Sequence, residues 1–150
     1  MIKNGEPYLI EYNIRMGDPE CQVILPRLET DLFKIITNAI RNKLKKINIK
    51  WKRSKSMTIV LCSKGYPNKY KNNRPIRNIN KVVLSKNDFI YHAGTKFNHN
   101  QLFSNGGRVL NVTSVGANFR NIRKKIIFMI KKLNWKDGFY RKDIGWRVIN

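Results

Sequence analysis

Polar and apolar residues alternate over residues 10–16, and this pattern predicts a β-strand over residues 8–16, near the start of the chain. The triplets Gly5-Glu6-Pro7 and Gly17-Asp18-Pro19 bound the segment and are typical of turns. Residues two apart on a strand point to the same face. We therefore expect one polar face made of Glu11, Asn13 and Arg15, and one apolar face made of Ile10, Tyr12, Ile14 and Met16.

Two helices are expected after this strand. Asp18 is predicted to be the N-cap of the first, with Pro19 at its first position and an end or kink at Pro26. Thr30 is predicted to cap the second. The apolar residues at helical spacing in the second helix are Leu32, Phe33, Ile35, Ile36, Ala39, Ile40 and Leu44.

The rest of the chain is predicted to consist of short strands and one closing helix. Residues 57–62 are a short apolar run typical of a buried strand, followed by a turn at 65–68 and a Lys/Asn-rich loop at 69–80. Further strands are expected at 88–92, around 97–103 and at 108–115, and a helix at 118–133. The inward stripe of that helix is predicted to be Phe119, Ile122, Ile126, Met129, Ile130 and Leu133.

These elements predict an α+β fold in two parts. Residues 1–50 are expected to be the end of one α+β domain, and residues 51–150 a small strand-rich domain with a closing helix. The polar, basic segment 48–56 is predicted to connect them.

Composition and charge narrow the class of protein. No apolar run approaches the roughly 20 residues that cross a bilayer, and the N-terminus lacks the apolar core of a signal peptide, so we expect a cytoplasmic protein without a membrane partner. The two cysteines are expected to be reduced and packed. The formal net charge is +22, from 31 Lys and Arg against 9 Asp and Glu, which suggests a polyanionic partner.

The basic residues are, however, spread along the whole chain together with many Asn and Ile, as biased nucleotide composition produces. We therefore expect no specific nucleic-acid partner, and keep a basic nucleic-acid-binding module as the alternative function. Its best candidate face lies on the last helix and consists of Arg120, Arg123, Lys124, Lys125, Lys131 and Lys132.

The polar face of the first predicted strand carries the candidate chemistry. The carboxylate of Glu11 and the amide oxygen of Asn13 are hard ligands of the kind that Mg²⁺ takes, and it uses few protein ligands. Arg15 adds a forked donor for phosphoryl oxygens, so the three residues suit phosphoryl transfer. The spacing alone fits a strand with three solvated polar residues equally well.

A longer motif carries a family resemblance. The segment Glu11-Tyr12-Asn13-Ile14-Arg15-Met16-Gly17-Asp18-Pro19-Glu20 resembles the signature Glu-x-Asn-x-Arg-x-Gly-Asp-Pro-Glu of the phosphoribosylamine–glycine ligases of the ATP-grasp superfamily. Later segments resemble the family's motifs in the same order: Gly65-Tyr66-Pro67, His92-Ala93-Gly94-Thr95, Gly106-Gly107-Arg108-Val109-Leu110 and Phe139-Tyr140-Arg141-Lys142-Asp143-Ile144-Gly145.

The resemblance implies an ATP-dependent carbon–nitrogen ligase of purine biosynthesis. It would join glycine to 5-phosphoribosylamine through a glycyl phosphate, giving glycinamide ribonucleotide. Glu11 and Asn13 would correspond to the Mg²⁺ or Mn²⁺ ligands that hold the ATP phosphates, and Arg15 to the group that steadies the γ-phosphate. Asp18 would orient the amine substrates, or serve only as a helix cap, or both.

The other motif residues are expected to be mainly structural. His92 has no nearby partner in metal-ligand spacing, and Gly106-Gly107 is expected to be a tight turn and not a P-loop. Thr95 and Lys96 are predicted to face the nucleotide-sugar side of the cleft.

Family members are much longer than 150 residues. The resemblance therefore implies that this chain is the C-terminal part of such a ligase, with residues 1–50 as the remnant of the ATP-grasp domain. We expect the part alone to be inactive, and its partner to be the missing N-terminal part of the same enzyme.

Overall fold

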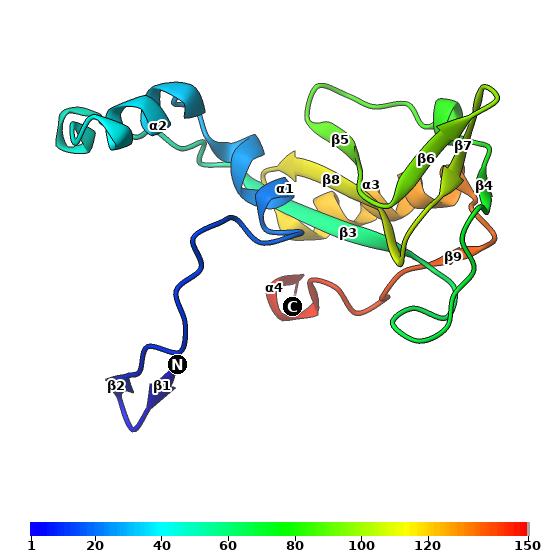
Figure 1. Cartoon of the computed structure of the whole chain (residues 1–150), viewed down its shortest axis with the longest axis horizontal. Coiled ribbons are helices and arrows are strands. Elements are labelled where there is room, and N and C mark those ends of the chain that lie inside the picture. The colour runs from blue at the N-terminus through cyan, green and yellow to red at the C-terminus, as the bar shows by residue number, and fades with distance from the viewer. Residues whose placement is uncertain (150) are drawn as a thin grey trace.

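A four-stranded antiparallel sheet with the order β5-β8-β3-β9 is the centre of the computed structural model, which describes residues 1–149 (Figure 1). The two long strands, β3 (Lys55–Ser63) and β8 (Arg108–Gly116), pair from Lys55↔Gly116 to Leu61↔Leu110. The register then shifts, so that Cys62 lies opposite Arg108. β5 (Asp88–His92) pairs with the other edge of β8, and β9 (Gly138–Phe139) pairs with the end of β3. The strands predicted at 57–62, 88–92 and 108–115 are confirmed.

The helix α3 (Phe119–Leu133) packs on one face of this sheet, against β3 and β8. Asn118 caps it by accepting a hydrogen bond from the Asn121 amide, and Asn134 ends it in the left-handed conformation. The predicted stripe is confirmed, with Phe119 only partly buried. The core that α3 and the sheet share contains Met57, Ile59, Leu61, Leu110, Val112, Ile122, Ile126, Met129, Ile130 and Leu133.

A second, three-stranded sheet has the order β4-β7-β6, made of β4 (Pro75–Ile76), β6 (Thr95–Asn98) and β7 (Gln101–Ser104). The sequence predicted a single strand around 97–103, and this prediction is wrong. The chain reverses at His99 and Asn100, which both have positive φ, of 44° and 56°. Asn tolerates this conformation better than most residues, so a hairpin turn forms in the polar segment between Phe97 and Leu102.

The N-terminal part reaches away from the central sheet (Figure 1). β1 (Ile2–Lys3) and β2 (Glu6–Pro7) form a hairpin. Residues 8–16 follow as irregular chain, so the strand predicted there is wrong. A strand needs a neighbour that satisfies its backbone groups, and β1 and β2 pair only with each other among the described residues.

Helices of the N-terminal part differ from the predictions at their ends. α1 (Cys21–Ile24) continues into the 3₁₀ turn η1 (Leu25–Arg27), and both contact the sheet on the side opposite α3. α2 (Leu32–Ile40) is capped by Asp31, which accepts from the Lys34 amide, and not by Thr30 as predicted. The Thr30 hydroxyl instead accepts from the Lys50 amide, and an antiparallel bridge joins Leu28 to Trp51.

Three further short elements complete the described chain: η2 (Leu44–Lys46), η3 (Ile79–Lys81) and α4 (Trp146–Ile149). η2 takes up Leu44, so the second helix ends earlier than its apolar spacing predicted. The predicted mixture of helices and strands is confirmed, and the paired strands are antiparallel. Within residues 1–149, no helix combines the length and the apolar character needed to span a bilayer.

Candidate functional site

Glu11 and Asn13 lie beside each other, because Asn13 Nδ2 donates a hydrogen bond to Glu11 Oε1 at 3.0 Å. Both side chains are exposed. Arg15 has a different partner, since its Nη1 donates to the Met16 carbonyl at 3.3 Å. Although the segment is no strand, it still brings two of the three predicted residues together.

The Glu11–Asn13 pair suits a hard cation in its donor chemistry. The hydrogen bond uses the amide nitrogen of Asn13 and leaves its carbonyl oxygen free to bind, together with the second carboxylate oxygen of Glu11. Two oxygen ligands are typical of Mg²⁺ sites that phosphates and water complete. Over residues 1–149, no group of three or more His, Cys, Asp or Glu side chains is placed to hold a metal ion. A metal at this pair would therefore depend on ligands from a bound phosphate.

Asp18 does not cap α1, contrary to the prediction. The helix begins at Cys21, with Glu20 at the N-cap position, and the Glu20 carboxylate instead accepts from the Gly17 amide at 3.1 Å. The Asp18 carboxylate accepts a hydrogen bond from Gln22 Nε2 at 3.0 Å. Asp18 therefore organises the turn in front of the helix.

Arg108 connects this turn to the central sheet. Its Nη1 donates to the Asp18 carbonyl at 2.7 Å, and its Nη2 lies 3.3 Å from the Asp18 carboxylate. Arg108 stands at the start of β8, ninety positions further along the chain. Sequence reasoning placed Arg108 inside a motif without giving it a role, because nothing in its spacing indicates a partner so distant.

The later motifs of the chain come together behind Arg108. Gly94 donates to the Arg108 carbonyl at 2.9 Å, and an added Cβ on Gly94 would lie 2.9 Å from the Gly106 Cα. The Ser63 hydroxyl donates to the Gly106 carbonyl and the Ser63 amide donates to the Gly107 carbonyl, each at 2.8 Å. Backbone segments thus approach each other closely at these glycines, where a Cβ would not fit, as expected for a tight turn.

The Tyr66 ring covers Gly107 so closely that an added Cβ there would lie 2.1 Å from a ring carbon. The motifs that contain Tyr66, Gly94 and Gly107 therefore form one packed unit. Their shared role in this structure is to set the path of the backbone into β8.

His92 and Thr95 pair with each other, with His92 Nδ1 3.0 Å from Thr95 Oγ1. This contact links the end of β5 to the start of β6. The Lys96 side chain is exposed. The contact suits the structural role expected of His92, and it gives Thr95 a local partner.

The face of the sheet beneath α1 is polar. Ser114 lies on the face of β8 that is turned toward α3, where its hydroxyl donates to Asp88. Residues on a strand alternate between faces, so Asn111 and Thr113 lie on the opposite face. Thr113 donates to Thr58 at 2.7 Å, and Thr58 donates to the Val112 carbonyl. The buried atoms without a hydrogen-bond partner in the described chain include Asn111 Nδ2 and Oδ1, Ser56 Oγ, Gln22 Oε1 and Arg27 Nε.

Neither cysteine is disulfide-bonded, as predicted. Burial raises the pKa of the Cys62 thiol, although the nearby Arg108 guanidinium opposes this shift. Cys62 is therefore protonated at neutral pH and is a poor nucleophile.

Three of the six basic residues on α3 are engaged in structural contacts. Arg120 donates to the Ile149 carbonyl, and Arg123 donates to the carbonyls of Ile144 and Lys142. Lys125 lies 2.8 Å from the buried Asp88 carboxylate. Half of the face proposed for nucleic acid thus holds the C-terminal segment and the edge strand in place.

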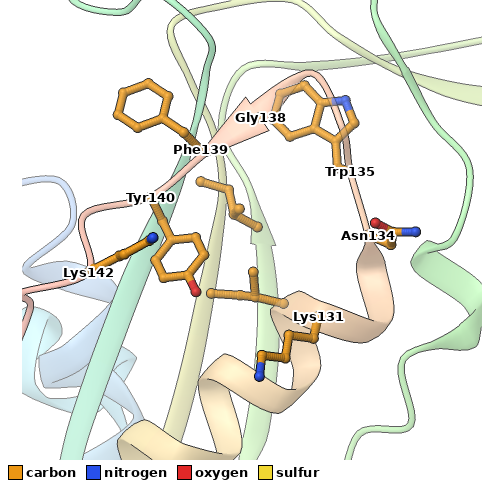
Figure 2. Close-up of a pocket in the computed structure, with 9 residues that line it drawn as sticks. Lys131, Asn134, Trp135, Gly138, Phe139, Tyr140 and Lys142 are labelled. Atoms are coloured by element: carbon orange, nitrogen blue, oxygen red, sulfur yellow. The ribbon is translucent and has the colours of Figure 1, made fainter.

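A pocket of 390 Å³ opens between the end of α3 and β9 (Figure 2). Its floor contains Leu61 and Ile130, and Tyr140 and Trp135 line its sides. Two cations, Lys131 and Lys142, stand at its rim (Figure 2). The pocket is distant in sequence from Glu11 and Asn13.

Comparisons with known proteins agree on one family. Residues 56–147 match the family model described as "Phosphoribosylglycinamide synthetase, C domain". The phosphoribosylamine–glycine ligase of Agrobacterium fabrum is 42% identical over 149 residues, which is 99% of this chain and 35% of that protein. The chloroplastic enzyme of that name from Arabidopsis thaliana is 38% identical over 149 residues, covering 98% of this chain and 28% of its own length.

A solved structure supports the same relationship. The crystal structure of phosphoribosylamine–glycine ligase from Thermotoga maritima matches with a TM-score of 0.71 and 28% identity, over 95% of this chain and 34% of that one. The chain thus spans about a third of the length of the relatives that it matches.

Proposed function

Since the chain belongs to the phosphoribosylglycinamide synthetase C-domain family, we propose that it is part of a phosphoribosylamine–glycine ligase. In this proposal, residues 1–50 complete an ATP-grasp domain and residues 51–150 form the C-terminal domain. The observation that carries the proposal is the Glu11–Asn13 pair, next to a turn that Arg108 ties to the family's own domain. The reaction is the ATP-dependent joining of glycine to 5-phosphoribosylamine.

The chain's residues divide the work as follows in this proposal. Glu11 and Asn13 offer oxygen ligands to Mg²⁺ or Mn²⁺, and a metal bound there would supply positive charge against the ATP phosphates. Arg15 releases the Met16 carbonyl and turns its fork to the γ-phosphate. Asp18, already held by Arg108 and Gln22, orients the amine.

The chemistry takes place in two displacements. A glycine carboxylate oxygen attacks the γ-phosphorus of ATP, the bond to the β-phosphate oxygen breaks, and ADP leaves. The amine nitrogen of 5-phosphoribosylamine then attacks the acyl carbon, phosphate leaves, and the nitrogen loses a proton. Charge spreads over the phosphoryl oxygens in the first step, which is where Arg15 acts.

We expect the 150-residue chain alone to show no turnover, because it spans about a third of its relatives' length. Assay of glycine-dependent ADP release with phosphoribosylamine tests this point, and robust release by the chain alone would contradict it.

A chimera tests the function itself. The matching 149 residues of the Agrobacterium fabrum ligase are replaced by this chain, and glycine-dependent ADP release is measured with phosphoribosylamine. An active chimera supports the proposal, whereas a folded chimera that hydrolyses no ATP beside an active parent contradicts it. The cytoplasmic location predicted from the sequence stays a prediction, since one relative is named chloroplastic.

A further inference from the structure

A hollow with four cations and one carboxylate lies between the segment that follows β3 and the segment that follows α3. Its volume is 250 Å³, and its lining residues are Lys64, Lys69, Tyr70, Lys71, Arg74 and Asp137. Counted over these side chains, the charge is +3 at neutral pH. A concave surface of one sign raises the local concentration of counter-ions far more than the same charges spread over a convex surface.

The walls of the hollow are fixed by backbone hydrogen bonds. Arg74 and Ser104 bind each other twice, from the Arg74 amide to the Ser104 hydroxyl at 3.1 Å and from the Ser104 amide to the Arg74 carbonyl at 2.8 Å. The Lys64 amide donates to the Asp137 carbonyl at 2.9 Å. The segments that carry Lys64 and Arg74 are therefore each held by hydrogen bonds to a neighbouring segment.

The segment that carries Lys69 and Lys71 is anchored as well. Gly65, at a φ of +97°, approaches the Lys69 carbonyl so closely that an added Cβ would lie 2.1 Å from its oxygen. The Tyr70 ring meets the Tyr66 ring edge to face at 6.0 Å. The loop that the sequence predicted at 69–80 is thus tied at both ends, to Tyr66 and to β7.

A second hollow, of 340 Å³, adjoins the first through Asp137 and adds Arg77 and Lys136. Trp135 lines it, and Trp135 Nε1 is buried without a hydrogen-bond partner among residues 1–149. The indole nitrogen lies on the ring edge turned away from Phe139 and Tyr140 (Figure 2). The second hollow thus combines an unmatched N–H donor with the cations Arg77 and Lys136, a lining that suits an oxygen-rich ligand.

Asp137 is the one group that opposes an anion here. Its carboxylate lies 3.8 Å from Arg74 Nε, too far for a strong pair, and both side chains are substantially exposed. Asp137 therefore neutralises part of the Arg74 charge without closing the hollow.

We propose that this surface is a binding site for a compact oligophosphate anion, with Lys69, Lys71 and Arg74 as its main ligands. The cations converge on one hollow instead of following a stripe, which favours a compact anion over a nucleic-acid backbone, whose charges are spaced along a line. The site is separate from Glu11 and Asn13 and does not depend on the proposed ligase activity.

Titration calorimetry of the whole 150-residue chain with inorganic tripolyphosphate tests the proposal. The double variant Lys69→Glu/Lys71→Glu is expected to weaken binding about tenfold or more. Its matched control, Lys43→Glu/Lys45→Glu, makes the same change in net charge on exposed residues near η2 and is expected to weaken binding less than about threefold. Equal losses in the two variants would show an effect of overall charge and overturn the site.

Asp137→Asn removes a negative charge from the hollow and should change the affinity in the opposite direction. It is expected to tighten tripolyphosphate binding about threefold or more, whereas Glu29→Gln, at an exposed acid elsewhere, is expected to leave it nearly unchanged. An unchanged affinity in Asp137→Asn contradicts the proposal. The absence of measurable tripolyphosphate binding to the wild type would also contradict it. A third contradicting result is a single-stranded oligonucleotide that binds the wild type more tightly than tripolyphosphate does and binds the Lys69→Glu/Lys71→Glu variant only weakly.

Discussion

The Arg108 guanidinium joins two motifs ninety positions apart, with 2.7 Å to the Asp18 carbonyl and 3.3 Å to the Asp18 carboxylate. One contact is a charge-assisted hydrogen bond to the backbone, so it fixes the turn itself and not only a side chain. The position of Glu11 and Asn13 relative to the sheet depends on this turn, because it is where their segment meets α1.

Arg108→Met is expected to loosen this turn. The amides of residues 17–23 should exchange hydrogen about fivefold to tenfold faster, which corresponds to about 1 kcal/mol for a hydrogen bond of this kind. Hydrogen-exchange mass spectrometry measures the change. Arg141→Met, which removes an exposed pair with Asp143 two residues away, is the control and should leave residues 17–23 unaffected. Unchanged exchange in Arg108→Met would mean that α1 is held by other contacts.

Glu11→Ala and Asn13→Ala are expected to abolish turnover in an active chimera. Loss of a group that only supports a metal ligand costs about 10- to 100-fold in affinity, so loss of a ligand should reach at least the upper value. Glycine-dependent ADP release is measured against Mn²⁺ concentration, with Lys3→Ala as a control in the same exposed region. Wild-type Mn²⁺ dependence in either variant would remove that residue from the site.

Asp88→Asn is expected to destabilise the fold by about 1–3 kcal/mol, the usual effect of spoiling a buried hydrogen-bonded group. Burial on its own would raise the pKa of Asp88, but the hydrogen bonds from Lys125, Ser85 and Ser114 outweigh it and lower the pKa below its ordinary value. A carboxyl group with a lowered folded-state pKa stabilises the fold above its unfolded-state pKa of about 3.9, and this stabilisation disappears as the pH falls through the folded-state value.

The stability difference between the wild type and Asp88→Asn should therefore be constant from about pH 5 to 7 and shrink below about pH 4. Urea denaturation at a series of pH values measures it. Asp143→Asn, at an exposed ion pair, should shift the midpoint far less. A difference that grows on acidification would contradict the sign argued here.

Ile126→Ala is expected to cost about 2–5 kcal/mol, because Ile126 is fully buried between α3 and the sheet and its truncation leaves a cavity. Phe128→Ala on the same helix removes a larger side chain that is 60% exposed, and should have a much smaller effect. Chemical denaturation measures the free energy of unfolding of both variants. A larger loss in Phe128→Ala than in Ile126→Ala would contradict the described core.

Gly94→Ala is expected to destabilise the motif cluster by about 1–3 kcal/mol, as overpacking does. Its Cβ would meet backbone atoms, 2.7 Å from the Arg108 oxygen and 2.9 Å from the Gly106 Cα, and neither can move alone. In Gly17→Ala the Cβ would meet only the end of the flexible Glu20 side chain, so a smaller effect is expected in thermal denaturation. Equal melting temperatures for Gly94→Ala and wild type would show that the close approach is not needed.

The elements that sequence reasoning located correctly are those whose own residues determine them. β3 contains a short apolar run, and β8 is rich in valine and other residues that favour strands. α3 carries a 3.6-residue stripe between an Asn cap and a left-handed Asn, so local pattern and burial agree. The segment 8–16 has an equally clear alternation, yet a strand also requires a neighbour to pair with, and alternation contains no information about that neighbour.

The contacts that assemble the motifs were not predictable for a similar reason. Arg108 and Asp18, or Gly94 and Gly106, meet only because the sheet register brings distant segments together. The candidate site residues were chosen by their resemblance to a family, whereas their arrangement came only from the structure. The hairpin at His99 and Asn100 was missed because the polar residues 98–101 were read as part of one strand and not as a turn.

The two faces of the central sheet differ in polarity, and this difference affects how the protein unfolds. Under α3 the sheet presents isoleucine, leucine and valine, whereas under α1 it presents hydroxyl and amide groups, several without partners. Water entering beneath α1 would satisfy those groups, while water entering beneath α3 would satisfy nothing. Residues 1–50 should therefore detach reversibly at temperatures where the sheet and α3 remain intact, giving the chain two melting units of unequal strength.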